Sequence, residues 1–200
     1  IYDMRRPEPS KEVPTIEEAE KERERLNRRA IYRQTFRGTA GVLIVVAAIS
    51  VLVATLWMPV LQIYGSSMSP TLERGQIVIS VKNKHLKTGD IVAFWQGNKL
   101  LVKRVIAGPG QWVDIDAGGV VTVDGQTLDE PYLKEVSLGN CDIELPHQVA
   151  ESHWFFMGDN RATSVDSRTA SIGDVSEDQI EGQIVFRIWP LNAAGSMRQN

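Results

Sequence analysis

The 200-residue sequence has few of the residues that build disulfides and metal sites. It contains one cysteine, Cys141, which excludes a disulfide within this sequence, and its three histidines are scattered at positions 85, 147 and 153. No Cys/His cluster has the spacing of metal ligands. The formal net charge is only −3, so nothing indicates a nucleic-acid partner. We therefore expect no metal ion and no other cofactor.

Long apolar runs are also scarce, with one exception. No charged residue occurs from Gly38 to Leu72, and the centre of this stretch, 42–58, is almost wholly apolar. A helix that rises about 1.5 Å per residue needs about 20 residues to span the hydrocarbon core. A cleaved secretory signal and a buried core helix are the alternatives, but both this run and the segment before it are long for a signal. We expect a membrane anchor over 38–60 that separates a charged segment, 1–37, from a domain at 61–200.

The charges that flank the expected span predict its orientation. Arginines at positions 23, 25, 28, 29, 33 and 37 precede it, whereas the first positive charge after it is Arg74. Positive charges concentrate on the cytoplasmic side of membrane helices. We therefore expect a single-pass protein of the cytoplasmic membrane, with a cytoplasmic N-terminus and an extracytoplasmic domain.

The third zone has the pattern of a mainly β domain. Short β-rich runs alternate with turn residues, and Asp124-Gly125 within 118–128 is a strong hairpin signal. The other expected strands are 76–81, 90–96, 100–106, 112–116, 153–160 and 182–190. Helices do not alternate with these strands, so we expect an antiparallel, barrel-like β domain and not a parallel α/β sheet.

Two kinds of general base are available to a serine nucleophile in this sequence. The histidines lie in loops or at the start of a strand, and none has a pattern typical of a Ser-His-Asp triad. A lysine can act as the base only if burial lowers its pKa from about 10.4. Lys103 stands between Leu101 and Val105 on one face of an expected strand, with Arg104 on the other face. The pattern alone leaves open a solvated lysine on an edge strand.

Two polar clusters are candidates for the rest of an active site. The stretch IYGSSMSPTLERG, 63–75, follows the span directly and combines three serines with a proline and a glycine that stiffen and turn the chain. It can present a hydroxyl at a fixed place, although an ordinary wet loop has a similar composition. The stretch MGDNRATSVDSR, 157–168, includes Asp166 and Arg168, which are placed to pair as buried ions require.

Together these clusters resemble the type I signal peptidases, which are membrane-anchored serine proteases with a serine–lysine dyad. GSSMSPTL is similar to the nucleophile box of that family, KRVIAGPG to its lysine box, and GDNRATSVDSR to its downstream box. GDIVAF resembles a further box. The four boxes follow one N-terminal span in the order of the family, and the similarity covers the span and nearly all of 61–200.

The resemblance implies roles for individual residues. Ser67 would be the nucleophile and Lys103 the general base, while Ser164 would bond to Lys103 and orient it. The residues that would support the site from the downstream box are Asp159, Asp166 and Arg168. The implied reaction is cleavage of a peptide bond through an acyl-enzyme.

The resemblance also implies a substrate, and it leaves the second hydrogen-bond donor to the oxyanion unassigned. Family members cut secretory precursor proteins after a small-x-small pattern. The residues that the match places at two shallow apolar pockets are Ile63, Tyr64, Met68, Leu72, Leu101 and Val102. The N–H of Ser67 would bind the oxyanion, but Gly65 stands where some members carry a second, hydroxyl donor. The alternatives for this second donor are the backbone of Gly65, Ser66 and a water.

Two further functions are compatible with the sequence. One is a Ser-Lys protease that processes a different exported substrate, such as a pilin. The other is a membrane-tethered β binding module with no hydrolytic activity. The membrane itself is an expected partner in all three cases, and the sequence does not define an oligomeric state.

Overall fold

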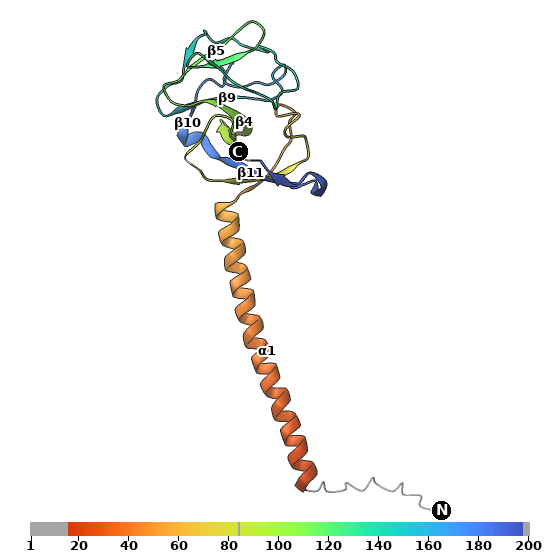
Figure 1. Cartoon of the computed structure of the whole chain (residues 1–200). Helices are drawn as coiled ribbons and strands as arrows, with labels where there is room; N and C mark the ends of the chain where they lie inside the picture. The colour runs from red at the N-terminus through yellow and green to blue at the C-terminus, as the bar shows by residue number, and fades with distance from the viewer. Residues whose placement is uncertain (1–15, 84, 198–200) are drawn as a thin grey trace, which may run out of the picture. The chain divides into compact units, whose positions relative to one another are not determined.

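The computed structural model describes residues 16–83 and 85–197, and the chain divides into two units, Ile1–Leu52 and Val53–Asn200. A single helix, α1 (Ile16–Trp57), runs without a break through the charged and the apolar segments (Figure 1). The helix ends two residues before Pro59, which cannot donate a helical hydrogen bond. The part of the charged segment at 1–15 lies outside the described residues.

The apolar part of α1 has the properties of a membrane span. Within Glu20–Leu52 the helix is long enough to cross a bilayer, and its mean hydropathy reaches 1.9. Large apolar side chains such as Val42, Ile44 and Leu52 are exposed. This exposure argues against the helix of a soluble core, so α1 is a candidate membrane anchor.

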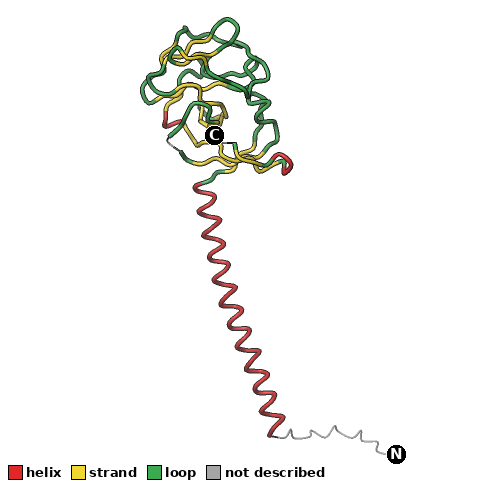
Figure 2. Tube along the Cα trace, in the orientation of Figure 1, coloured by secondary structure: helices red, strands yellow, loops and turns green. Residues whose placement is uncertain are grey.

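The second unit consists mainly of two antiparallel sheets joined by long loops (Figure 2). The larger sheet comprises β1 (Val60–Gln62), β2 (Ile77–Val81), β3 (Ile91–Gln96), β4 (Lys99–Ala107), β9 (His153–Met157), β10 (Val175–Ser176), β11 (Ile180–Trp189) and β12 (Gly195–Ser196). Its order is β1-β2-β11-β3-β4-β9-β10, and β12 pairs with β11. The prediction of a mainly antiparallel β domain is confirmed.

The smaller sheet comprises β5 (Trp112–Ile115), β6 (Val121–Val123), β7 (Gln126–Thr127) and β8 (His147–Gln148), in the order β7-β6-β5-β8. Asp124 and Gly125 connect β6 to β7, and both have positive φ, of 52° and 77°. A two-residue hairpin turn requires this geometry, as the Asp-Gly sequence predicts. Two short 3₁₀ helices, η1 (Glu177–Gln179) and η2 (Leu191–Ala193), flank β11.

The large sheet is covered on both faces where it carries β3 and β4. Along β3, Ile91 and Ala93 join one apolar cluster, whereas Val92 and Phe94 join a second cluster. A third cluster joins the end of β4 and strand β9 to the small sheet. In Figure 1, β4 and β9 accordingly lie between β5 and β11. Because β4 pairs with β3 on one side and β9 on the other, Lys103 does not lie on an edge strand.

Candidate active site

Lys103 lies in the interior strand β4, and its side chain is only 3% exposed. Its Cα partner across the sheet is Val92, a fully buried residue of β3. Its Nζ donates a hydrogen bond of 2.8 Å to the hydroxyl of Ser164, on the loop that follows β9. The sheet and this loop therefore hold one amine in a largely dry position.

The surroundings of Lys103 lower its pKa from 10.5 to about 8. Burial is the main cause, because it penalises the ammonium form. The charge of Asp166 acts in the opposite direction, Arg168 adds to the lowering, and Asp159 raises the pKa. A lysine with a pKa of about 8 has a substantial neutral fraction near pH 7–8, so its amine can accept a proton from a neighbouring hydroxyl.

Ser67 lies in the loop between β1 and β2, which is folded into consecutive turns. Ser69 N donates to Ser66 O at 3.1 Å, and Leu72 N donates to Met68 O at 2.8 Å. Met68 and Leu72 are both buried in an apolar cluster below the loop. These two anchors fix the backbone of the loop while Ser67 stays half-buried at its surface.

A second loop, 158–168, packs directly against Ser67. The backbone N of Asn160 donates to Ser67 O at 3.0 Å, and its side chain donates to Ser66 O at 3.4 Å. Gly158 is the point of closest approach, since a Cβ there would lie 2.5 Å from Ser67 O and would clash with the Ser164 hydroxyl. The structure thus brings Ser67, Ser164 and Lys103 to one place.

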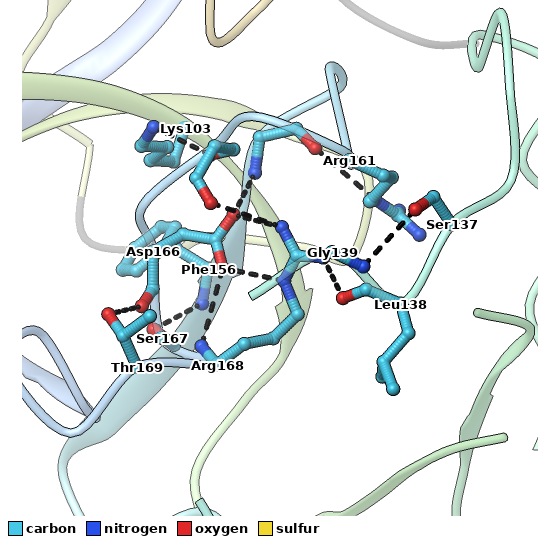
Figure 3. Close-up of polar contacts among 12 residues, drawn as sticks. Lys103, Ser137, Leu138, Gly139, Phe156, Arg161, Asp166, Ser167, Arg168 and Thr169 are labelled. Carbon is cyan, nitrogen blue, oxygen red and sulfur yellow. Dashed lines mark hydrogen bonds and ion pairs between the residues drawn. The ribbon is translucent and has the colours of Figure 1, made fainter. Parts of the chain in front are cut away.

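The loop around Ser164 is held by a buried ion pair (Figure 3). Arg168 Nε donates to Asp166 Oδ1 at 2.8 Å, and its Nη2 donates to Asp166 Oδ2 at 2.9 Å. Burial raises the pKa of Asp166, but Arg168, the N–H of Gly158 and the hydroxyl of Ser164 together hold it below its usual range. Asp166 therefore stays ionised and accepts a hydrogen bond from the hydroxyl that contacts Lys103.

Asp159 is held from the other side of the site, by Arg104. The Arg104 Nε and Nη2 donate to the two carboxylate oxygens of Asp159, at 2.8 and 2.6 Å. The sequence pattern predicts Arg104 on the strand face opposite that of Lys103 and indicates no partner for it. A buried arginine inside an apolar strand requires an acidic partner, and this requirement is the signal that points to Asp159.

Sequence reasoning also missed Arg161, Glu130 and Tyr132. Arg161 donates to both carboxylate oxygens of Glu130, and the Tyr132 hydroxyl donates to Glu130 at 2.7 Å. No periodicity or turn signal marks the segment DEPYL, 129–133, that supplies Glu130 and Tyr132. It comes from the long connection between β7 and β8, whose position a local pattern does not specify.

A small, largely apolar groove with a volume of 140 Å³ adjoins Ser67. Its lining residues are Gln62, Ile63, Tyr64, Gly65, Ser67, Met68, Leu100, Leu101 and Val102. Five of the six residues expected at substrate pockets therefore lie together beside Ser67. The sixth, Leu72, is fully buried under the loop and does not line this groove.

The histidines lie in different surroundings. His147, on β8 of the small sheet, contacts Asp174 through Nε2 at 2.8 Å and packs against Phe155. His153 Nδ1 contacts the carbonyl of Glu151 at 2.7 Å. Across residues 16–83 and 85–197, no group of three or more His, Cys, Asp or Glu side chains is arranged to hold a metal ion.

A buried amine with a lowered pKa, bonded to the Ser164 hydroxyl and beside the loop of Ser67 with its apolar groove, is the class of site that can perform general-base chemistry. Comparison with known proteins specifies the family. The family model described as "Signal peptidase, peptidase S26" matches residues 36–189. The chain belongs to this signal peptidase family.

Two relatives by sequence agree with this assignment, and one solved structure is similar over part of the chain. The chain is 35% identical over 150 residues to signal peptidase IB of Staphylococcus aureus strain Mu50, which covers 65% of the chain and 77% of that protein. It is 31% identical over 164 residues to signal peptidase I of Bacillus amyloliquefaciens, covering 76% of the chain and 88% of that protein. A crystal structure of a signal peptidase I from Enterococcus faecalis V583 aligns with a TM-score of 0.41 and 26% identity, over 50% of this chain and 96% of that one.

Proposed function

We propose that this protein is a membrane-anchored serine endopeptidase that removes N-terminal signal peptides from secretory precursors, with Ser67 as nucleophile and Lys103 as general base. The observation that carries the proposal is the buried Lys103 amine, with a pKa of about 8, bonded to Ser164 beside the loop of Ser67. Membership in the signal peptidase family supports the substrate.

The reaction begins with proton transfer. Neutral Lys103 Nζ takes the proton of Ser67 Oγ as that oxygen attacks the carbonyl carbon of the scissile bond. The resulting ammonium returns the proton to the leaving amine, which departs as the new N-terminus of the mature protein. Lys103 then takes a proton from water as the water oxygen attacks the acyl carbon. It returns that proton to Ser67 Oγ, which leaves as the signal peptide is released as a carboxylic acid.

The neighbouring residues keep the amine in place and hold the loops together. Ser164 accepts a hydrogen bond from Lys103 and contacts Asp166, so it occupies the orienting position of a triad's third member. The N–H of Ser67 is one donor for the oxyanion, and Gly65 offers no side-chain hydroxyl beside it. The pairs Asp166–Arg168 and Asp159–Arg104 support the downstream loop.

The groove beside Ser67 supports a preference for small residues before the cut. Its volume of 140 Å³ and its apolar lining suit short side chains in extended substrate, as a small-x-small motif supplies. The anchor supports the same function, because a retained α1 with arginines on the cytoplasmic side places Ser67 outside the cell, a few residues beyond the span.

The decisive experiment is cleavage of a purified secretory precursor by the full-length protein in detergent micelles. We expect Ser67→Ala and Lys103→Met each to reduce cleavage by at least about 1000-fold. The combined replacement of His85, His147 and His153 by alanine should retain activity. Loss of activity in a folded triple-histidine variant would contradict a lysine base.

Substrate choice separates the remaining alternatives. We expect cleavage of the signal-peptide precursor. We expect no cleavage of a control precursor that carries a bulky residue directly before the cut. Cleavage of a pilin-type substrate alone would assign a different processing role. Absence of both hydrolysis and covalent labelling by acylating inhibitors would indicate a binding module.

A further inference from the structure

Segment 129–133 contributes a buried acidic residue to the loop that carries Ser164. Arg161 Nη1 donates to Glu130 Oε2 at 3.0 Å, and Arg161 Nη2 donates to Glu130 Oε1. The two side chains are 1% and 7% exposed. A two-point contact between a planar guanidinium and a carboxylate fixes orientation as well as distance.

Tyr132 connects the same segment to a second buried arginine, Arg104. Its hydroxyl donates to Glu130 at 2.7 Å, and the guanidinium carbon of Arg104 lies 3.7 Å from the centroid of its ring. Burial and the adjacent Glu130 carboxylate raise the pKa of the Tyr132 hydroxyl, so it stays a donor. Glu130 and Tyr132 therefore contact two of the three buried arginines at this loop, Arg161 and Arg104.

The same two guanidinium groups also contact residues 158–159, which pack beside Ser67 and Ser164. Arg161 Nε donates to Gly158 O at 3.2 Å, and Arg104 holds both oxygens of Asp159. Gly158 packs against both Ser67 and Ser164 without room for a Cβ. A small shift of residues 158–159 consequently changes the spacing of the two serine residues.

We propose that Glu130 and Tyr132 are positioning residues for peptide-bond cleavage, acting through Arg161 and Arg104 on Gly158 and Asp159. The inference rests on the proposed function, because it assigns these residues to the geometry of Ser67, Ser164 and Lys103. Neither Glu130 nor Tyr132 lines the groove beside Ser67. Their effect therefore belongs to the chemical step and not to substrate affinity.

The test compares Glu130→Gln with Asp129→Asn in the full-length protein. Asp129 is the adjacent exposed residue, so its variant makes the same change of charge without touching the arginines. We expect Glu130→Gln to lower kcat by roughly 10- to 100-fold with KM within about twofold, since small misplacements of reacting groups have costs of this order. Asp129→Asn should match the wild type.

Two milder variants keep the test decisive if Glu130→Gln unfolds, as a broken buried ion pair can. Glu130→Asp keeps the charge and Tyr132→Phe removes only the hydroxyl. We expect Tyr132→Phe to lower kcat several-fold, and Glu130→Asp to retain more activity than Glu130→Gln. Each rate is divided by the concentration of folded protein, which is measured by circular dichroism. This normalisation corrects for any loss of stability.

The double variant Glu130→Gln/Arg161→Gln tests whether the pair acts as a unit. We expect its kcat to equal that of Arg161→Gln alone, because both replacements break the same contact. Additive losses, a loss confined to KM, or wild-type kcat in folded Glu130→Gln or Tyr132→Phe would overturn the inference.

Ser67→Ala, measured in the same assay, separates this inference from the proposed function. An inactive Ser67→Ala beside fully active Glu130 and Tyr132 variants refutes only the positioning role. An active Ser67→Ala refutes the proposed function, and the positioning role with it.

Discussion

Lys103 shows how the fold changes the chemistry of a single side chain. Strand β4 places the amine among buried residues, and burial accounts for most of the lowering of its pKa to about 8. The charges of Asp166 and Asp159 limit this effect by favouring the ammonium. The balance leaves a base that is partly neutral near physiological pH, in place of one that is almost wholly protonated.

The first prediction at this scale concerns pH. Because the neutral amine is the reactive form, kcat/KM should rise about tenfold per pH unit below pH 8 and level off above it. A profile of precursor cleavage from pH 6 to 10 measures this, with the triple-histidine variant as control. A midpoint near 6.5 that disappears in that variant would indicate a histidine base.

The second prediction concerns stability. The pKa of Lys103 is lower in the folded chain, about 8, than its ordinary value of 10.5, so the folded state loses stability as the pH falls through this interval. At about 1.4 kcal/mol per pKa unit, the penalty at pH 7 is up to about 3 kcal/mol. Lys103→Met should therefore raise the free energy of unfolding at pH 7, while activity is lost.

Unfolding of both proteins at pH 7 and at pH 10 measures this penalty. The advantage of Lys103→Met should shrink at pH 10, where the wild-type amine is neutral. Lys99→Met is the matched control, since Lys99 lies exposed on the same strand. Equal changes in the two variants would show that burial of the charge is not the cause.

At the scale of elements, the site depends on the contact between the loop after β1 and the loop after β9. Asn160 N binds Ser67 O, and Gly158 fills the remaining space without a side chain. Both loops begin at strands of the same sheet, so the strand order brings together segments more than 90 residues apart in the chain.

The contact predicts that Gly158→Ala is severely impaired. A Cβ at this position meets Ser67 backbone at 2.5 Å, so one loop must move. We expect a loss of roughly 100-fold in kcat/KM, by displacement of reacting groups. Gly195→Ala, with open space around its Cβ, should leave cleavage unchanged. Wild-type rates in Gly158→Ala would show that the loops tolerate separation.

Local patterns predicted the longer strands and their turns well. The expected strand 90–96 is β3 with one residue fewer, and 100–106 is β4 with one more at each end. The two-residue strands β8 and β10 are not separately predictable, since they are defined by pairing with β5 and β9, which lie much earlier in the chain. Glu130 is hidden for a similar reason, since its contact with Arg161 joins residues 31 positions apart in the chain.

The candidate site was predictable to the extent that its residues form continuous stretches. Ser67, Lys103 and Ser164 come from three such stretches, and the structure brings them together; their catalytic roles stay predictions. Arg104 and its contact with Asp159 depend on the tertiary fold. A strand pattern gives the face on which a side chain lies, but not the partner that it meets there.

At the scale of the whole molecule, the anchor determines which side of the membrane holds the site. The single cysteine allows a direct measurement, because Cys141 belongs to the unit that carries Ser67 and is partly exposed. In intact cells, a membrane-impermeant maleimide should label Cys141. Positive charges before the candidate span are the physical reason for this expectation.

Two variants complete this topology test. Cys141→Ser should remain unlabelled, and Cys141→Ser/Glu24→Cys, with the thiol on the exposed charged part of α1, should react only after permeabilisation. The reverse pattern would place the site in the cytoplasm.

The continuity of α1 has a consequence for the inner leaflet. Its 42 residues extend about 63 Å, roughly twice the hydrocarbon thickness, so a long helical part stands outside the acyl chains. Arg29, Arg33 and Arg37 recur every four residues on that part and follow one side of it. In the proposed orientation they face anionic headgroups, each worth about 1 kcal/mol of attraction. The depth of the anchor in the bilayer then depends on how much phosphatidylglycerol-like lipid the leaflet contains.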